Sequence, residues 1–114
     1  MLPHRREFAT HLKRIIKSMH RQKPLACSIC QQRIEPWEQL TIDHWRGRHD
    51  NRPENAQPAH HYCNQRKGNQ ILPDNPVSLA FTQRLLAELA QDPYWQLAEG
   101  ADNTDNNLDL LNRE

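Results

Sequence analysis

Two short motifs, each with two residues between its metal-binding side chains, constrain the fold of this chain more than any other feature. The first is Cys27-Ser-Ile-Cys30 and the second is His60-His-Tyr-Cys63. This spacing lets both side chains of a turn face one ion, and two such turns complete the tetrahedral ligand set of zinc. A structural zinc site of three cysteines and one histidine also explains the odd cysteine count. The spacing favours His60 over His61 as the fourth ligand, and His61 stays the alternative.

The composition makes such a metal site valuable for folding. The chain has 114 residues, of which 36% are hydrophobic, and its mean hydropathy is −1.00. A small domain with so few apolar residues buries little surface and often gains stability from a bound metal. No apolar run approaches the roughly 18 residues of a membrane span, and the charged first residues lack the apolar segment of a secretion signal. We therefore expect a cytoplasmic protein without a membrane partner.

Charge is distributed unevenly along the chain. Residues 1–70 contain 13 Lys and Arg against 6 Asp and Glu, whereas residues 71–114 contain 2 against 8. A basic first part suggests a polyanionic partner such as nucleic acid. Surfaces that merely differ in sign are the plainer explanation, and charge alone gives the two interpretations about equal weight.

Periodicity predicts an α+β domain with a helix on each side of its core. Apolar residues from Phe8 to Met19 form one stripe of a helix over 5–22, whose basic faces either contact phosphate or are simply solvated. Asn75 and Pro76 predict the start of a second helix, over 77–91, with Phe81, Leu85, Leu86 and Leu89 as its buried stripe. Strands are expected over 39–43 and 56–60, with a short helix from about Cys63 to Gly68. The resulting division is 1–24 (basic helix), 25–72 (zinc-bound core), 73–99 (second helix) and 100–114 (an acidic tail, expected to be disordered).

Side chains suited to hydrolytic chemistry lie between and directly after the two motifs. Asp43 and His44 are adjacent at the end of a predicted strand, so their side chains start on opposite faces. A carboxylate with an amide oxygen, such as that of Asn64, suits Mg²⁺ or Mn²⁺. A neutral histidine suits a general base. Arg66 and Lys67 follow, and both side chains are suited to phosphate.

These residues, in this order, resemble the HNH endonuclease family, also called the ββα-metal nucleases. The resemblance rests on 27-CSIC-30, 41-TIDHW-45 and 52-RPENAQPAHHYCNQRKG-68, and it covers about 42 of the 114 residues. It implies a small ββα-metal core, with a structural zinc ion, that hydrolyses DNA phosphodiester bonds. The flanking helices lie outside it.

The resemblance also implies a role for each matching residue. His44 matches the base that activates water, and Asp43 with Asn64 matches the ligands of the catalytic Mg²⁺ or Mn²⁺. Asn55 matches the asparagine that braces the loop and orients the base, and Lys67 matches the lysine that follows the metal ligand. The positive side chains expected to contact nucleic acid are Arg46, Arg48, Arg66 and Lys67. For Arg46 and Arg48, a merely solvated loop carries nearly equal weight.

Four residues depart from the family pattern, and one of them is His60, which stands where many relatives have cysteine. Ala56 and Ala59 stand where relatives have leucines, so packing behind the second strand is thinner and zinc matters more. Trp45 replaces an aliphatic residue and either packs in the core, which we favour, or covers the base. No catalytic group is lost. The expected function is therefore a DNA endonuclease or nickase, and the alternative is an inactive zinc-bound module that binds nucleic acid or a protein partner.

Overall fold

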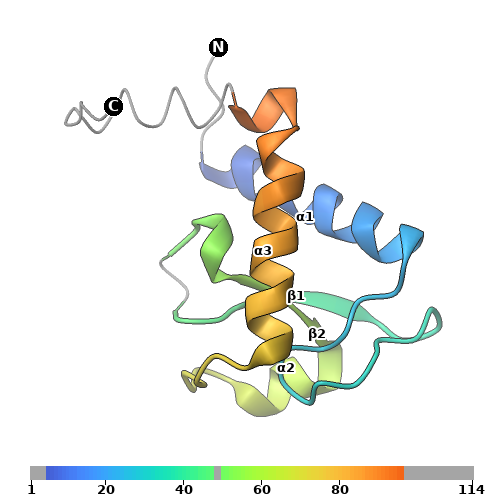
Figure 1. Ribbon diagram of the computed structural model, residues 1–114. Coiled ribbons are helices and arrows are strands. Elements are labelled where there is room, and N and C mark those ends of the chain that lie inside the picture. Colours follow the sequence, from blue (N-terminus) through green and yellow to red (C-terminus); the bar gives the residue numbers. More distant parts are fainter. Residues whose placement is uncertain (1–4, 48–49, 97–114) are drawn as a thin grey trace.

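The computed structural model describes residues 5–47 and 50–96, with side chains from Thr10 onward. Its elements follow in the order α1 (Arg5–Gln22), β1 (Leu40–His44), the short 3-10 helix η1 (Pro53–Asn55), β2 (Ala56–His60), α2 (His61–Lys67) and α3 (Pro76–Ala90) (Figure 1). The predicted α+β class is confirmed. The predicted tail at 100–114 lies outside the described residues. None of the described helices is both long and apolar enough to cross a membrane.

Helix α1 forms where the apolar stripe predicted it. Leu12, Ile16 and Met19 are buried, whereas Lys13 and Lys17 are exposed. The chain leaves the helix in a turn closed by a side chain, because the Leu25 N–H donates to His20 Nδ1 at 2.9 Å.

The two strands pair antiparallel, with Leu40 opposite His60 and His44 opposite Ala56. This register places the predicted zinc ligand His60 at one end of the hairpin and the predicted base His44 at the other. Strand β1 begins and ends one residue later than predicted, so His44 is paired within the strand. Strand β2 agrees with its predicted bounds, and all five of its residues are buried.

Helix α3 begins with a reciprocal cap. Asn75 Oδ1 accepts from the Ser78 N–H at 2.9 Å, and Ser78 Oγ accepts from the Asn75 N–H at 2.8 Å. Phe81 and Leu89 are buried as predicted, and so is Leu85. The prediction that Leu86 belongs to this stripe is wrong, because it is 38% exposed. A residue next to Leu85 lies about 100° around the helix and leaves the narrow buried face.

Hydrophobic packing is divided between two clusters. The larger cluster joins α1, α3 and the residues near them: Leu12, Ile16, Met19, Leu25, Ala56, Phe81, Leu85, Leu89 and Trp95. The smaller one consists of Cys27, Ile34, Ala59 and Cys63. Two of these four residues are predicted zinc ligands. The second cluster therefore holds little apolar surface apart from the metal-binding side chains.

A buried glutamine connects the two halves of the fold. Gln57 Oε1 accepts from Ser28 Oγ at 2.6 Å. Its Nε2 donates to Thr82 Oγ1 at 2.7 Å and to the Ser78 carbonyl at 3.2 Å. The side chain is only 2% exposed. Gln57 thus links the first cysteine turn, β2 and α3 through polar contacts in the interior.

We expect Gln57→Leu to lower the free energy of unfolding by roughly 2–4 kcal/mol, because it leaves buried polar partners without hydrogen bonds. Urea denaturation of the zinc-loaded protein measures this change. Gln83→Leu, at an exposed position of α3, is the matched control and should change stability by less than about 0.5 kcal/mol. Equal effects of the two substitutions would contradict the role of Gln57.

The turn after α1 predicts a pH dependence of stability. Burial lowers the pKa of His20 below its usual value, and its neutral Nδ1 accepts the Leu25 N–H. The unfolded chain therefore binds a proton at a higher pH than the folded chain. The resulting stabilisation is complete above the ordinary histidine pKa of about 6.5 and is lost as pH falls below it.

His20→Asn keeps a neutral acceptor near the position of Nδ1 and cannot titrate. Between pH 7 and pH 5 we expect the wild type to lose about 1 kcal/mol more unfolding free energy than this variant, the net value of one hydrogen bond. Urea denaturation of both proteins at each pH gives the difference in unfolding free energy between them. Acid effects at the zinc site cancel in this difference because both proteins have the same zinc ligands. Identical pH profiles would show that His20 contributes nothing.

A candidate zinc centre and the cavity beside it

The four predicted zinc ligands converge although they lie in two separate stretches of the chain. Cys27, Cys30, His60 and Cys63 place their ligand atoms within 4.8 Å of one another. His60 Nδ1 lies 3.5 Å from Cys30 Sγ and 3.8 Å from Cys63 Sγ. Sulfur and nitrogen ligands arranged tetrahedrally around zinc are separated by about 3.5–3.8 Å. The cluster therefore forms a plausible zinc-binding site.

The ionisation of the thiols also fits a cation. Burial raises the pKa of the Cys27 thiol, but backbone N–H groups, first of Cys30 and then of His60, outweigh it and bring that pKa to about 7. Burial, together with the neighbouring Cys27 and Cys30 thiols, raises the pKa of Cys63 to about 12. Three thiolates this close repel one another, so a bound cation is needed to ionise all of them.

His60, not His61, belongs to the cluster. The Nε2 atom of His60 lies 3.0 Å from Glu38 Oε1. The Glu35 backbone N–H, which donates to the same Glu38 oxygen at 2.9 Å, lowers the pKa of Glu38. An ionised carboxylate only accepts, so the His60 proton is on Nε2 and the Nδ1 lone pair faces the cysteines. This carboxylate–histidine arrangement is typical of the outer shell of a metal site.

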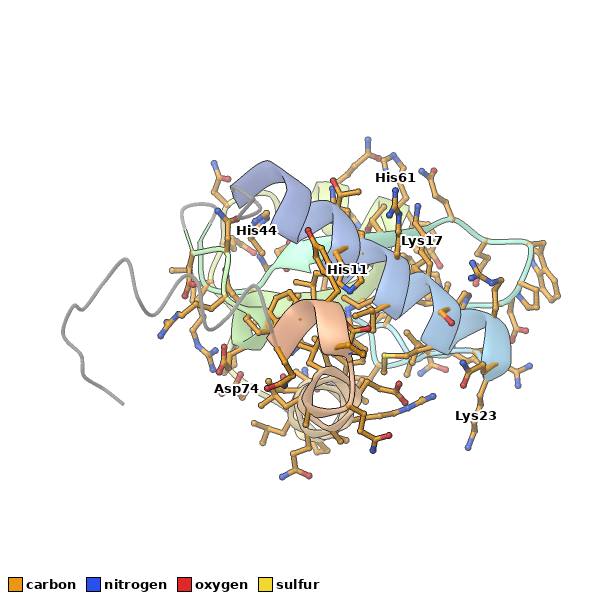
Figure 2. The ribbon with its side chains drawn as sticks, turned by 90° about the horizontal axis from the view of Figure 1, so that it is seen from above. His11, Lys17, Lys23, His44, His61 and Asp74 are labelled. Atoms are coloured by element: carbon orange, nitrogen blue, oxygen red, sulfur yellow. The ribbon has the colours of Figure 1, made fainter. Side chains whose placement is uncertain are left out.

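A large cavity lies beside the zinc centre, along β1 and α2. Its volume is about 880 Å³, and Asp43, His44, Asn64 and Lys67 all line it. Residues 43 and 44 come from the end of β1, whereas residues 64 and 67 are one turn apart on α2. His61, at the start of α2, also lines the cavity. Figure 2 shows His44 and His61 on the side of the molecule that faces away from α3.

Asp43 and Lys67 form a buried ion pair at the wall of this cavity. Asp43 Oδ2 lies 3.1 Å from Lys67 Nζ, and the two side chains are 6% and 3% exposed. The ammonium group is not aligned as a hydrogen-bond donor, so this buried oxygen has no hydrogen-bond partner among the described residues. Lys67 Nζ also lies 5.8 Å from the centre of the Trp45 ring. Asp43 Oδ2 thus has an ionic partner in Lys67 but no aligned hydrogen-bond donor among the described residues.

His44 is exposed and is oriented by a residue that the sequence did not single out. Its Nε2 lies 3.3 Å from Asn51 Oδ1. An amide oxygen only accepts, so this contact places the His44 proton on Nε2 and leaves the Nδ1 lone pair free. Asn51 stands in a loop rich in turn-forming residues, and nothing in its sequence context indicated a contact with His44.

Asn55 braces the loop that follows His44. Its Oδ1 accepts from the Arg46 N–H at 2.6 Å. Its Nδ2 donates to the carbonyl oxygens of Gly47 and Asp50, each at 2.8 Å. Asn55 is 2% exposed, and these bonds fix the loop from which Asn51 reaches His44. The described contacts therefore show Asn55 holding the loop, and Asn51 contacting the imidazole.

Asn64 connects helix α2 to strand β1. Its Nδ2 lies 3.4 Å from Thr41 Oγ1, a long contact in which the amide nitrogen donates. Asp43 and Asn64 line the same cavity, so a carboxylate and an amide group lie at one cavity wall.

The predicted phosphate-binding residues have different surroundings. Lys67 lines the cavity, whereas Arg66 lies 5.8 Å from the centre of the exposed Tyr62 ring and does not line it. The guanidinium of Arg46 donates to Asp74 Oδ2 at 2.6 Å. Arg48 lies outside the described residues.

Asp74, which pairs with Arg46, also holds the Trp45 side chain in place. Asp74 Oδ1 accepts from Trp45 Nε1 at 3.1 Å, and the indole is fully buried. The expectation that Trp45 packs in the core is therefore confirmed. Asp74 thus ties the end of β1 and the following loop to the segment before α3.

Comparison with known proteins gives no further guide to the site. The chain matches no family model, no curated protein and no solved structure.

The His60–Glu38 contact predicts an outer-shell contribution to zinc binding. We expect Glu38→Gln to weaken zinc binding by about 10–100-fold, because the ligand loses the carboxylate that fixes its orientation. Competition with a chromogenic chelator measures the affinity. Glu35→Gln is the matched control, since the Glu35 carboxylate pairs with Arg33 instead. A Glu38 variant that binds zinc as tightly as the control would contradict the assignment.

Proposed function

We propose that this chain is a metal-dependent endonuclease of the HNH type that cuts or nicks DNA. One observation carries the proposal: Asp43, His44, Asn64 and Lys67 line a single cavity. The first two lie 20 to 24 positions before the last two in the sequence. Neither a zinc centre nor general binding of nucleic acid requires this combination of an acid, an imidazole, an amide and a lysine.

The arrangement of the elements supports the family resemblance. A two-stranded hairpin is followed at once by a short helix, and the candidate zinc ligands hold the start of that helix. The acid and imidazole come from the first strand and the amide from the helix. This is the order that a ββα-metal core requires, with the zinc cluster at the end of the hairpin remote from His44.

In the proposed mechanism His44 is the general base. Asn51 holds the His44 proton on Nε2, so Nδ1 is free to take a proton from the water that attacks the phosphate. Such a base typically contributes ~10²–10⁴-fold to the rate. The exposure of His44 on the cavity wall leaves room for the scissile phosphate and water.

Asp43 and Asn64 would hold a divalent cation, Mg²⁺ or Mn²⁺. When bound, that ion would stabilise the negative charge that develops on the phosphate and the leaving oxygen. Asp43 suits this task because, among the described residues, its buried Oδ2 accepts no hydrogen bond and has only the Lys67 ammonium as an ionic partner. Lys67 supplies a positive charge at the same wall, within reach of a phosphate bound in the cavity. The implied products carry a 5′-phosphate and a 3′-hydroxyl.

Charge on α1 supports a DNA substrate. Lys13 lines a smaller hollow of about 70 Å³ together with Asp43 and His44. Lys17 follows one turn later and lies on the same side of the molecule as His44 in Figure 2. Exposed lysines beside a candidate active site suit the phosphate backbone of a strand that extends beyond the cavity.

The proposal predicts that His44→Ala abolishes nicking of supercoiled plasmid in Mg²⁺ or Mn²⁺, with a loss of at least about 100-fold. Zinc content and thermal unfolding should stay unchanged, because His44 is exposed and lies at the opposite end of the hairpin from the zinc cluster. Agarose electrophoresis of plasmid over time gives the rate, and EDTA should stop the reaction.

His61→Ala is the matched control, because His61 is a second exposed histidine on the same cavity. We expect it to lose less than tenfold. An unchanged rate in His44→Ala would remove this residue from the mechanism, and a larger loss in His61→Ala would transfer the role of base to His61. A purified protein that binds DNA but cuts it with neither metal would support the inactive binding module instead.

A further inference from the structure

Lys67 occupies an unusual position for a lysine. Its side chain is 3% exposed, and its ammonium group lies 3.1 Å from the buried Oδ2 atom of Asp43. Charged side chains are rarely buried unless an opposite charge accompanies them. Among the described residues, Lys67 is the one cationic side chain that forms an ion pair with Asp43. In the metal-free protein, the lysine therefore neutralises the carboxylate proposed to bind the catalytic cation.

A divalent cation and this ammonium group would compete for the same oxygen. Both are positive, and their mutual repulsion is strong in a buried site where water screens poorly. A cation that binds Asp43 must therefore displace Lys67 or remain close to it. Each outcome weakens the binding of the cation as long as the ammonium has no other anionic partner.

A substrate phosphate would provide that partner. Lys67 lines the cavity where the scissile phosphate is expected, and its flexible stem lets the ammonium move without a change in the backbone. The ammonium then exchanges one oxyanion for another. Asp43 is then free for the cation.

We propose that Lys67 is a resident counter-ion that keeps the catalytic cation site weak until DNA binds. This inference rests on the proposed function and concerns the order of assembly of its site. DNA and the cation then strengthen each other's binding, and by thermodynamic linkage the factor is the same in both directions. The protein would hold its divalent cation tightly only when a phosphodiester is in place.

Binding of Mn²⁺, measured from the EPR signal of the free ion, tests this without reference to activity. The zinc-loaded protein carries His44→Ala, so that added duplex DNA is not cut. The same protein with Asp43→Asn added, mixed with the same DNA, measures the Mn²⁺ that the DNA binds by itself. This amount is subtracted from the Mn²⁺ bound in each other sample that contains DNA. Without DNA, we expect Lys67→Gln to bind Mn²⁺ at least tenfold more tightly than the parent protein. DNA should tighten binding at least tenfold in the parent and less than threefold in Lys67→Gln.

Two further variants control for charge and for folding. Arg66→Gln removes the same charge from the next residue of α2, but Arg66 does not line the cavity, so Mn²⁺ affinity without DNA should stay within twofold of the parent. Lys67→Arg keeps the positive charge and should bind Mn²⁺ as weakly as the parent. Zinc content and thermal unfolding establish that each variant is folded. If Lys67→Gln does not fold, the tightening by DNA in the parent protein decides the matter.

Equal Mn²⁺ affinity in the parent and Lys67→Gln, or no tightening by DNA in the parent, would overturn the inference. If the wild type still nicks plasmid in Mn²⁺, the proposed function then stands and only the role of Lys67 fails. If no protein binds Mn²⁺ and the wild type does not nick DNA, the proposed function fails as well.

Discussion

The convergence of Cys27, Cys30, His60 and Cys63 is the constraint on which the remaining structure depends. Two of these side chains, Cys27 and Cys63, are half of the residues of the smaller buried cluster. They join the turn before β1 to the junction between β2 and α2, so a zinc ion there would fix the hairpin and the short helix together. A seven-residue helix such as α2 is too short to be stable without such tertiary contacts.

Buried hydrogen bonds also hold the elements of this small domain together. Strand β2 consists of Ala-Gln-Pro-Ala-His, which offers little apolar surface although every residue is buried. Gln57 compensates by bonding to Ser28 and Thr82, and Asn75 Nδ2 adds a bond to the Ser28 carbonyl at 2.8 Å. Buried hydrogen bonds of this kind specify one arrangement of elements, because each partner left unpaired is costly. They attach α3 to the part of the fold that contains the candidate zinc ligands.

The candidate active site uses the rigidity of that frame. The pleat of β1 buries Asp43 and exposes His44, and helix α2, which contains the candidate zinc ligand Cys63, brings Asn64 and Lys67 to the same cavity. Asn55 fixes the loop, and Asn51 of that loop contacts His44. A zinc ion bound by these ligands would have a structural role. It would fix the start of α2 and thereby the positions of the Asn64 and Lys67 side chains.

Features that spacing and periodicity set could be predicted from the sequence alone. The two metal-binding motifs, the stripe of α1, the cap at Asn75 and the bounds of β2 all depend on neighbours within a few residues, whose geometry is fixed locally. The packed fold was needed to show that His60, not His61, joins the three cysteines, that Leu86 faces outward and that Asn51 contacts His44. It also decided that Lys67 is buried against Asp43. Those outcomes depend on which side chains from distant parts of the sequence come into contact. A local sequence pattern does not specify how separate elements are oriented relative to one another.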